Sequence, residues 1–348
     1  MAKSYLIVRT DRVGDVLLTT PLNAAIRAAD PNARISWLVR PYTAPLLEKN
    51  PDIDQVLLDK GGSISSLVKA LKPHHFDVAI AAYPRWRVIW ALYRAGIPMR
   101  IGPASKWYSV LLTQRIWQHR SEGKQHEADY NLELLAPLGI PFRRYPTQFV
   151  LTADEKQQAR KTLESHRISF RKPVVILHPG SGGSSARWPL VRFMELGDRL
   201  QEQGCDVVVT GGPGEDYQYI MIDNMRRIPV FIAAGSISLR ELGALFSAVQ
   251  LVVSNSTGPL HMAVALGVPT VSVYSPIPTC HPQRWGPYPA YAEKKGLHDV
   301  VLAPDDGLPN EDMAKVSVEN VLALCIKRLV ENAATLTPVD RPAGQAGL

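Results

Sequence analysis

The sequence predicts an α/β protein with two doubly wound domains. Apolar runs of strand length alternate with helical patterns along both halves of the 348-residue chain, and this alternation is typical of βαβ units and parallel sheets. The length supports about two domains, at a prior of roughly 150 residues each. The hydrophobic fraction of 46% and the charged fraction of 20% are ordinary for a globular protein with a core of normal size.

One stretch shows the βαβ pattern most clearly. Residues 251–274 read LVVSNSTGPLHMAVALGVPTVSVY, with buried strands expected at 251–253 and 270–274. Between them, a small-residue loop at 254–258 leads into a helix that begins at Pro259 and stops at Gly267. Proline suits the first turn of a helix and glycine suits the position after its end. Such a crossover places the loop at the carboxyl end of a parallel strand, where the N–H groups of the next helix favour an anion.

The other elements follow in chain order. In the first half we expect strands at 5–9, 35–39 and 78–82 and helices at 15–29, 64–71 and 127–138. Thr152 and Glu155 have the spacing of a capping box, so a helix should begin there and run to about residue 166. After a polar, basic linker at 167–172, a second series should contain strands at 174–177 and 206–210, a helix at 189–203, a capping box at Ser238 and Glu241, and a last helix at 316–332.

These elements divide the chain into a first domain at residues 1–168 and a second at 169–333, both Rossmann-like. The tail at 334–348 is rich in Pro and Gly, and we expect it to be disordered. Doubly wound sheets bind their ligands at the carboxyl ends of the strands. The two domains should therefore face a central cleft that holds the substrates.

The positive charge is unevenly distributed along the chain. The formal net charge is +7, yet no Asp or Glu occurs between residues 78 and 121. That stretch holds seven basic residues and four tryptophans: Arg85, Arg87, Arg94, Arg100, Lys106, Arg115, Arg120, Trp86, Trp90, Trp107 and Trp117. A basic and aromatic surface suits an anionic partner. Nucleic acid is not expected, because no recognised binding motif accompanies the charge. Alternatively, helical periodicity would send some of Trp86, Trp90 and Tyr93 into the core.

No metal or cofactor is predicted. The three cysteines are far apart, and no grouping of His, Cys, Asp and Glu has metal-ligand spacing. Neither glycine loop has the GxGxxG spacing that a nicotinamide cofactor would require. The first residues contain too short an apolar run for a signal peptide, and no run approaches the ~20 apolar residues of a membrane span. We therefore expect a cytoplasmic protein.

Three loops at strand ends carry residues suited to chemistry. In the first, TDRVGD at 10–15, Asp15 is either a helix-capping or first-turn acid or a general base, and Asp11 competes for these roles. The second, HPGSGGSSARWP at 178–189, has glycines that let the backbone approach a diphosphate and serines that can bind it; its alternative is a flexible connection. In the third, TGGPGED at 210–216, Glu215 suits a ribose or simply the first turn of a helix.

These motifs together resemble a known family. The runs IVRTDRVGDVLLTTP, HPGSGGSSARWP, TGGPGED and SNSTGPLHMAVALGVPTVSVY occur in the order and at the spacing of the glycosyltransferases that include the lipopolysaccharide heptosyltransferases. The similarity spans roughly residues 4–330. It implies a GT-B glycosyltransferase fold, with the acceptor in the first half and a nucleotide sugar in the second. Such enzymes invert the anomeric centre without a metal, and the usual donor is ADP-heptose.

The resemblance implies roles for particular residues. Asp15 matches the catalytic base that takes a proton from the acceptor hydroxyl, and Gly14 matches the small residue before it that lets the acceptor approach. The donor-binding positions are Ser181, Gly182, Glu215, Thr257, Gly258 and His261. In this family the acceptor is an anionic, lipid-linked lipopolysaccharide core at the inner face of the inner membrane, so a peripheral membrane contact is implied. Arg85, Arg87 and Arg94 would then bind acceptor phosphates or carboxylates, with Trp86 and Trp90 beside sugar or lipid.

Two positions depart from the family pattern. Ala186 stands where relatives usually have a lysine that stabilises the departing diphosphate, and Arg187 is the alternative cation. Ser256 stands where heptose-specific members often have an aspartate that holds sugar hydroxyls. The main expectation is heptose transfer from ADP-heptose. Three alternatives stay open: a glycosyltransferase with another nucleotide sugar, a sugar-nucleotide epimerase, and an inactive sugar-nucleotide-binding protein.

Overall fold

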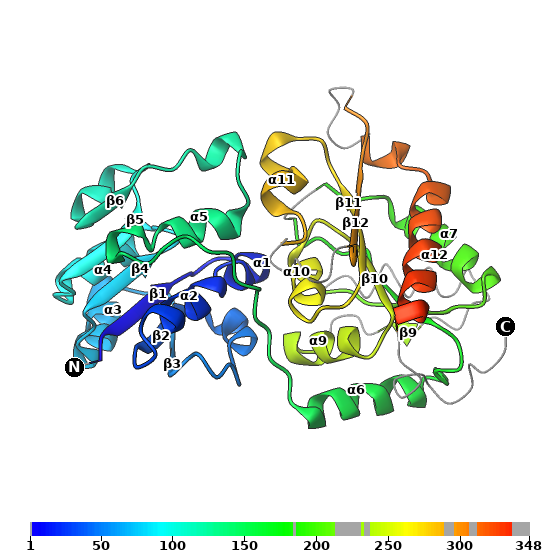
Figure 1. The fold of residues 1–348 in the computed structure, drawn as a ribbon, viewed down its shortest axis with the longest axis horizontal. Coiled ribbons are helices and arrows are strands. Elements are labelled where there is room, and N and C mark those ends of the chain that lie inside the picture. The colour runs from blue at the N-terminus through cyan, green and yellow to red at the C-terminus, as the bar shows by residue number, and fades with distance from the viewer. Residues whose placement is uncertain are drawn as a thin grey trace. The chain divides into compact units, whose positions relative to one another are not determined.

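The chain folds into two compact units. The computed structural model describes residues 2–183, 186–212, 231–232, 237–288, 296–305 and 312–335. Unit 1 comprises Met1–Val150 and Tyr288–Ala292, and unit 2 comprises Leu151–Pro287 and Glu293–Leu348. Each unit is an α/β structure built on a six-stranded sheet (Figure 1). The predicted α/β class with two doubly wound sheets is therefore confirmed.

The sheet of unit 1 is parallel, with the strand order β3-β2-β1-β4-β5-β6. The order reverses between β1 and β4, which is where a doubly wound sheet binds its ligands. The strands are β1 (Ser4–Val8), β2 (Arg34–Val39), β3 (Gln55–Leu58), β4 (Val78–Ala81), β5 (Met99–Pro103) and β6 (Gln114–Ile116). The α-helices are α1 (Val13–Leu17), α2 (Pro21–Ala29), α3 (Ile64–Leu71), α4 (Trp86–Arg94) and α5 (Glu127–Glu133), and short 3₁₀ turns include η3 (Trp107–Leu111).

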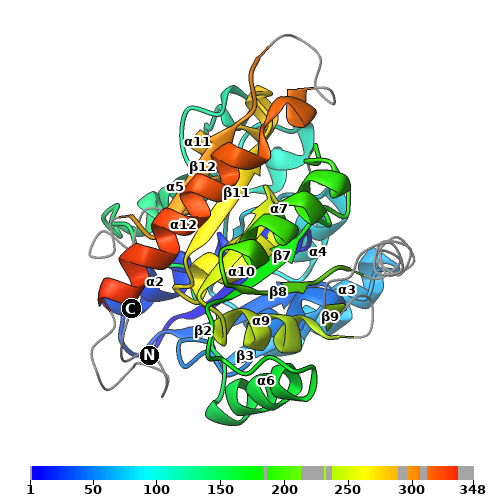
Figure 2. The same ribbon diagram turned by 90° about the vertical axis from the view of Figure 1, so that its right-hand side faces the viewer.

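The sheet of unit 2 has the order β12-β11-β10-β7-β8-β9 (Figure 2). Counted from its own first strand, this is the order of unit 1, and the switch point lies between β7 and β10. The strands are β7 (Val174–His178), β8 (Asp206–Val209), β9 (Phe231–Ile232), β10 (Leu251–Asn255), β11 (Thr270–Tyr274) and β12 (His298–Leu302). The helices are α6 (Ala153–Ser165), α7 (Leu190–Glu202), α9 (Leu239–Ser247), α10 (Gly258–Ala265), α11 (Pro282–Trp285) and α12 (Val318–Thr335).

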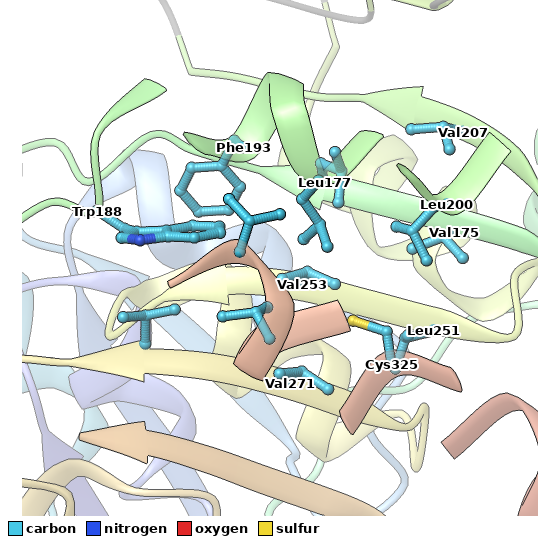
Figure 3. Close-up of a cluster of buried hydrophobic side chains, with 14 of the residues drawn as sticks. Val175, Leu177, Trp188, Phe193, Leu200, Val207, Leu251, Val253, Val271 and Cys325 are labelled. Atoms are coloured by element: carbon cyan, nitrogen blue, oxygen red, sulfur yellow. The ribbon is translucent and has the colours of Figure 1, made fainter. Parts of the chain in front are cut away.

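The core of unit 2 shows why its sheet carries helices on both faces. Alternate strand residues, such as Leu177 and Val253, pack with Phe193 of α7 and Cys325 of α12 in one buried cluster (Figure 3). Because successive strand side chains point to opposite faces, the residues between them face the other way. There, Tyr274 packs against α10.

Several predicted elements are confirmed at their expected positions. Both capping boxes form, at Thr152 with Glu155 and at Ser238 with Glu241. The βαβ unit has parallel strands, and Gly267 adopts a φ of +70° after α10. A positive φ favours glycine because it lacks a Cβ.

Other elements differ from expectation for identifiable reasons. The single helix expected at 15–29 is two helices, because Pro21 has no N–H to continue the first and begins the second. The α-helix expected at 127–138 ends at Glu133, and a 3₁₀ turn containing Pro137 follows. Five strands were not predicted: β3, β5, β6, β9 and β12. Among these, β3 and β6 are short and partly exposed and β5 ends in Gly-Pro, so none has the long apolar run of a central strand.

The chain divides earlier than the expected boundary at residue 168. Helix α6 belongs to unit 2, because it packs against α9 and its Glu155 forms an ion pair with Arg240. At the other end, α12 continues to Thr335, beyond the expected helix end at 332 and the expected domain end at 333. The rest of the predicted tail, 336–348, lies outside the described residues. Within the described ranges, no helix is long and apolar enough to cross a membrane.

The buried cluster in unit 2 makes a stability prediction. Phe193 is fully buried, and its ring meets that of Trp188 edge to face at 4.8 Å. Phe193→Ala should lower the free energy of unfolding by about 3–5 kcal/mol, because it removes the ring and leaves a cavity. Equilibrium urea denaturation measures the change. Val191 lies on the same helix but is 62% exposed, so Val191→Ala should change stability by less than about 0.5 kcal/mol; equal losses would contradict this account.

Candidate active site

In unit 1, a buried arginine organises the switch point of the sheet. Arg9 follows β1 directly and is 2% exposed. Its guanidinium contacts three carboxylates: Asp11 at 2.8 Å from Nε, Asp15 through Nη2, and Glu127 at 3.1 Å from Nη1. A buried charge is tolerated only when it is paired, so this contact set explains how an arginine can end a core strand.

Helix α5 supplies the far side of this cluster. Glu127 is 1% exposed and accepts a second ion pair, at 2.6 Å, from Nη1 of Arg120. Asn131 accepts a bond from Arg9 at 3.4 Å and donates to the backbone oxygen of Leu18 at 3.0 Å. The network therefore ties β1, α1 and α5 together around one guanidinium.

The cluster carries more negative than positive charge. Three carboxylates face two guanidinium groups, those of Arg9 and Arg120. Burial raises the pKa of Asp11 to about 6, although the adjacent Arg9 acts in the opposite direction. The nearby carboxylates hold the pKa of Arg9 above its ordinary value, against the effect of burial. The arginine therefore stays charged, and Asp11 is a carboxylate of this cluster whose affinity for a proton is raised.

Asp15 lies where a substrate can reach it. It is the third residue of α1, and its side chain is 17% exposed. The N-cap position of this helix is Arg12, so the interpretation of Asp15 as the N-cap is wrong. Its interpretation as an acid in the first turn is confirmed. Gly14, immediately before it, is buried in α1. In the part of the chain that the structure describes, the Asp15 carboxylate bonds Arg9 through Oδ1.

The three arginines proposed for the acceptor do not lie together. Arg85 is exposed just before α4, beside the carboxyl end of β4, with its guanidinium 5.2 Å from the Tyr83 ring. Arg87 forms an ion pair with the buried Asp59, so part of its charge is already used inside unit 1. Arg94 is in the last turn of α4. It lies about 13 Å from Arg85 along the helix axis, at a rise of about 1.5 Å per residue. Only Arg85 and Arg87 share the sheet edge of Asp15.

The tryptophans of this stretch are not in the core. Trp86 is 53% and Tyr93 47% exposed, and Trp90 is half-buried. The buried face of α4 consists instead of Val88, Ile89, Ala91 and Leu92. The expectation that some of the three aromatic residues enter the core is therefore wrong.

In unit 2, Asn255 links the two loops at the switch point. It is the last residue of β10 and is fully buried. Its Nδ2 donates to the backbone oxygen of Pro179 at 2.8 Å, and its Oδ1 accepts from the backbone N–H of Trp188 at 2.9 Å. One amide thus holds both ends of the loop after β7 against the end of β10.

These two loops carry most of the predicted donor residues. Ser181 is buried, and Gly182 and Gly183 adopt φ values of +49° and +70°. This backbone conformation favours glycine, although a Cβ there would meet nothing. Ser256 and Thr257 are also buried; Thr257 precedes α10, whose first residue is Gly258. That helix has no side-chain cap, so its first N–H groups can serve an anion.

The remaining predicted donor positions behave differently. His261 is buried in the first turns of α10. Ala186 packs against the core of unit 2, whereas Arg187 is exposed. Glu215 lies outside the described residues. The position of Ala186 is therefore held by a small, partly buried side chain, with a cation as its exposed neighbour.

A row of polar side chains crosses the same sheet. Thr210, His178, Ser254 and Ser272 occupy equivalent positions on neighbouring strands and are all buried. His178 Nδ1 lies 3.0 Å from Thr210 Oγ1, and its ring meets that of Phe246 edge to face. Desolvation lowers the pKa of His178 to about 4, so this histidine is neutral at physiological pH.

Arg9, Glu127 and Asn255 were not singled out from the sequence. Arg9 directly follows β1 and Asn255 is the last residue of β10, and a charge or amide at the end of a buried strand is the signal that could have identified them. Glu127 has no such signal, because its partner Arg9 is 118 residues away. Among the described residues, no cluster of three His, Cys, Asp or Glu could hold a metal ion.

The sequence matches the model of a known protein family and several known relatives. The family model described as "Glycosyltransferase family 9 (heptosyltransferase)" matches residues 64–301. The chain is 28% identical to a "Putative glycosyltransferase" of Haemophilus influenzae over 338 residues, covering 92% of the chain and 95% of the relative. It is 27% identical to "Lipopolysaccharide heptosyltransferase 3" of Escherichia coli, covering 75% and 79%.

Solved structures support the fold. A glycosyl transferase of family 9 from Veillonella parvula has a TM-score of 0.83 at 23% identity, covering 94% of this chain and 97% of that one. The E. coli ADP-heptose lipopolysaccharide heptosyltransferase II has a TM-score of 0.80 at 21% identity, covering 95% and 99%. At these identities the likeness concerns the fold, and it confirms the expected GT-B architecture.

The buried His178 makes a prediction about pH. In the unfolded chain a histidine has a pKa of ~6.5, whereas His178 in the folded chain has a pKa of about 4. Between these values the unfolded chain binds a proton that the folded chain does not, so stability rises with pH and is lost as the pH falls. This group should cost about 2 kcal/mol between pH 7 and pH 4.5. His178→Gln should remove that share of the loss, measured by urea denaturation at both pH values.

His166 provides the matched control. It is an exposed histidine of the same unit, at the end of α6. His166→Gln tests the same substitution at an exposed position, and it should change the free energy of unfolding at pH 7 by less than about 0.5 kcal/mol. If His178→Gln loses as much stability as the wild type between pH 7 and pH 4.5, another group is responsible for the loss.

Proposed function

Because this chain belongs to glycosyltransferase family 9, the heptosyltransferase family, we propose that it transfers heptose from ADP-heptose to a hydroxyl of a lipopolysaccharide inner-core acceptor. The reaction would proceed without a metal and with inversion of the anomeric carbon. The observation that carries the proposal is the Asp15 carboxylate, oriented by the buried Arg9 at the switch point of unit 1. The names of the relatives, which are lipopolysaccharide heptosyltransferases, support the choice of substrates.

In the proposed mechanism, Asp15 is the general base. Its Oδ1 is bonded to Arg9, which leaves the other oxygen to accept the proton of the acceptor hydroxyl as that oxygen attacks the anomeric carbon. The bond from the anomeric carbon to the diphosphate breaks on the opposite face, and the nucleoside diphosphate leaves with the electron pair. Positioned proton transfer of this kind typically contributes 10²–10⁴-fold to a rate.

The leaving diphosphate would bind in unit 2. The loop carrying Ser181 and Gly182 and the uncapped start of α10 at Thr257 and Gly258 offer hydroxyl and N–H groups at one sheet edge. Such donors stabilise charge that develops in the transition state. Arg187 is an exposed cation of this same loop. We propose that it stabilises the departing diphosphate in place of the lysine of the family pattern. His261 and Glu215 would complete the donor site.

A second donor is favoured by two specific residues. Ala186 replaces a cation by a core side chain, and Ser256 replaces an acid by a buried hydroxyl. Ser256 also lies beside the Tyr274 hydroxyl. Burial raises the pKa of Tyr274, and the hydrogen bond with Ser256 acts in the opposite direction. These changes alter both the charge and the hydrogen bonds available to the donor. A related transfer from another nucleotide sugar is therefore the alternative.

The acceptor would bind at the carboxyl edge of the sheet in unit 1. Gly14 directly precedes Asp15, and Arg85 offers positive charge at the same edge, as does Arg87 beside its partner Asp59. We propose an anionic, lipid-linked saccharide as the acceptor and a peripheral location at the cytoplasmic face of the inner membrane.

Removing the base tests the mechanism. Asp15→Asn should lower the turnover of donor in the presence of acceptor by at least about 100-fold, because an amide cannot take the proton. Nucleotide binding, measured by calorimetry, should persist because the base is not a ligand of the nucleotide. Full turnover in Asp15→Asn would reject Asp15 as the base.

Two further variants sharpen this test. Asp154 is also a first-turn helical acid, at the start of α6, so Asp154→Asn is the matched control and should keep full turnover. Asp11→Asn addresses the competing carboxylate that shares Arg9. A larger loss in Asp11→Asn than in Asp15→Asn would transfer the role of base to Asp11.

A nucleotide panel tests the donor. A ligand at ~100 times its dissociation constant stabilises the folded state by roughly 2.7 kcal/mol, which thermal unfolding can rank among ADP, UDP, GDP, CMP and NAD. We expect ADP to give the largest shift. A preference for UDP, GDP or CMP would support the alternative donor. No shift with any nucleotide would contradict the proposed donor site.

A further inference from the structure

Unit 1 exposes three large apolar side chains between residues 107 and 117. Trp117 is 79%, Trp107 72% and Val110 66% exposed, the highest values among the large apolar residues that the structure describes. Lys106 and Arg115 are exposed beside them in the sequence. We call these five residues the tryptophan edge. Isolated exposed apolar residues are common, but a contiguous group marks an interaction surface.

The local structure brings the five residues together. Trp107 and Val110 are three residues apart in the 3₁₀ turn η3, where residues i and i+3 lie on the same side. Trp117 follows β6, whose Ile116 accepts a bond from the N–H of Ala104 at 2.9 Å. Ala104, three residues before Trp107, therefore lies beside Ile116, the residue before Trp117. Arg115 is two residues before Trp117, so both point to the same face of the extended chain.

This surface is held rigidly. Tyr108 donates from its hydroxyl to the backbone oxygen of Pro84 at 2.9 Å, and its ring meets that of Trp107 edge to face at 5.4 Å. Ser109 is buried and bonds Ala104. Trp107 is therefore exposed because its neighbours anchor η3.

The charge around the tryptophan edge is positive. No acidic residue occurs between 78 and 121. The next acid, Glu122, forms an ion pair with Lys124 at 2.6 Å. Exposed cations flanking tryptophans match an anionic bilayer, in which the cations meet phosphates and the indole rings lie at the headgroup level.

The two tryptophans of this group lie toward the carboxyl end of the sheet. Trp117 and Trp107 follow the carboxyl ends of β6 and β5, and Asp15 follows that of β1. Strand β6 is three positions from β1 in the order β1-β4-β5-β6, which corresponds to roughly 14 Å at the usual strand spacing. An acceptor sugar emerging from a surface bound at β6 would need to extend only this far to reach Asp15.

We propose that the tryptophan edge is the membrane-contact surface of this protein, binding anionic phospholipid headgroups with Trp107, Val110 and Trp117 in the interface. The inference deepens the proposed function and rests on it for the lipid-linked acceptor. A saccharide partner is disfavoured because Val110 offers no flat ring for stacking and no hydrogen bond. A second copy of the same surface is disfavoured because its positive charges would repel.

Vesicle sedimentation tests the proposal directly. The full chain should bind vesicles of phosphatidylethanolamine with phosphatidylglycerol, and should bind phosphatidylcholine vesicles much more weakly. Trp107→Ser with Trp117→Ser should reduce the partition coefficient by at least about tenfold, because binding scales with the apolar area that enters the interface. Lys106→Ala with Arg115→Ala should reduce it by about 30-fold, at roughly 1 kcal/mol per basic residue.

Matched controls come from exposed residues elsewhere in the chain. Phe142 is 55% exposed, and Lys156 and Lys161 are exposed on α6. Phe142→Ser, and Lys156→Ala with Lys161→Ala, should keep wild-type binding. Thermal unfolding of each variant verifies that it is folded. Wild-type vesicle binding in a folded Trp107→Ser, Trp117→Ser variant would overturn the proposal.

A transfer assay separates this inference from the proposed function. With acceptor embedded in vesicles, the tryptophan variant should lose turnover; with acceptor freed of its acyl chains, it should keep it. Loss of turnover with both acceptors, together with unchanged vesicle binding, would assign the surface to the saccharide and reject the membrane. If no variant or wild type transfers sugar but vesicle binding still depends on the two tryptophans, the surface stands and the proposed reaction fails.

Discussion

The pairing of the buried Arg9 is the interaction on which the first half of this protein depends. A guanidinium at 2% exposure would be very unfavourable alone, and removing one partner of a buried pair typically costs about 3–5 kcal/mol. The chain meets this constraint by bringing Asp11, Asp15 and Glu127 to a single side chain. The same contacts that neutralise Arg9 orient Asp15, so the stability of β1 and the geometry of the candidate base have one physical cause.

Unit 2 solves the corresponding problem without charge. The strand that adjoins its switch point ends in Asn255 rather than in an arginine, and one neutral amide satisfies backbone groups of Pro179 and Trp188. A neutral linker would suit the proposed diphosphate site, because it leaves the helix start at Gly258 and the hydroxyls as the groups that would meet the negative charge. The two sheets share a strand order and differ in the side chains beside the switch point: carboxylates paired with Arg9 in unit 1, and the Asn255 amide beside the uncapped start of α10 in unit 2.

The departures at Ala186 and Ser256 concern this second site. Ala186 contributes to the core, so a lysine there would have to direct its charge away from packed side chains. The neighbouring Arg187 is exposed, and it is the cation that we propose for this loop. Neighbouring residues direct their side chains differently. In the proposed reaction, stabilisation of the leaving diphosphate would therefore depend on where the Arg187 side chain points.

The sequence by itself determined the α/β alternation, both capping boxes, the glycine-rich loops and the family, because periodicity, capping and motif spacing depend on residues close together in the chain. The tertiary structure alone decided that Arg9 meets Glu127, 118 residues away, and that Asn255 meets Trp188, 67 residues away. It also separated Arg94 from Arg85 along α4 and exposed Trp107 and Trp117. These outcomes depend on which strands are neighbours and which side of each turn is covered, and the local pattern of the sequence carries no direct record of either.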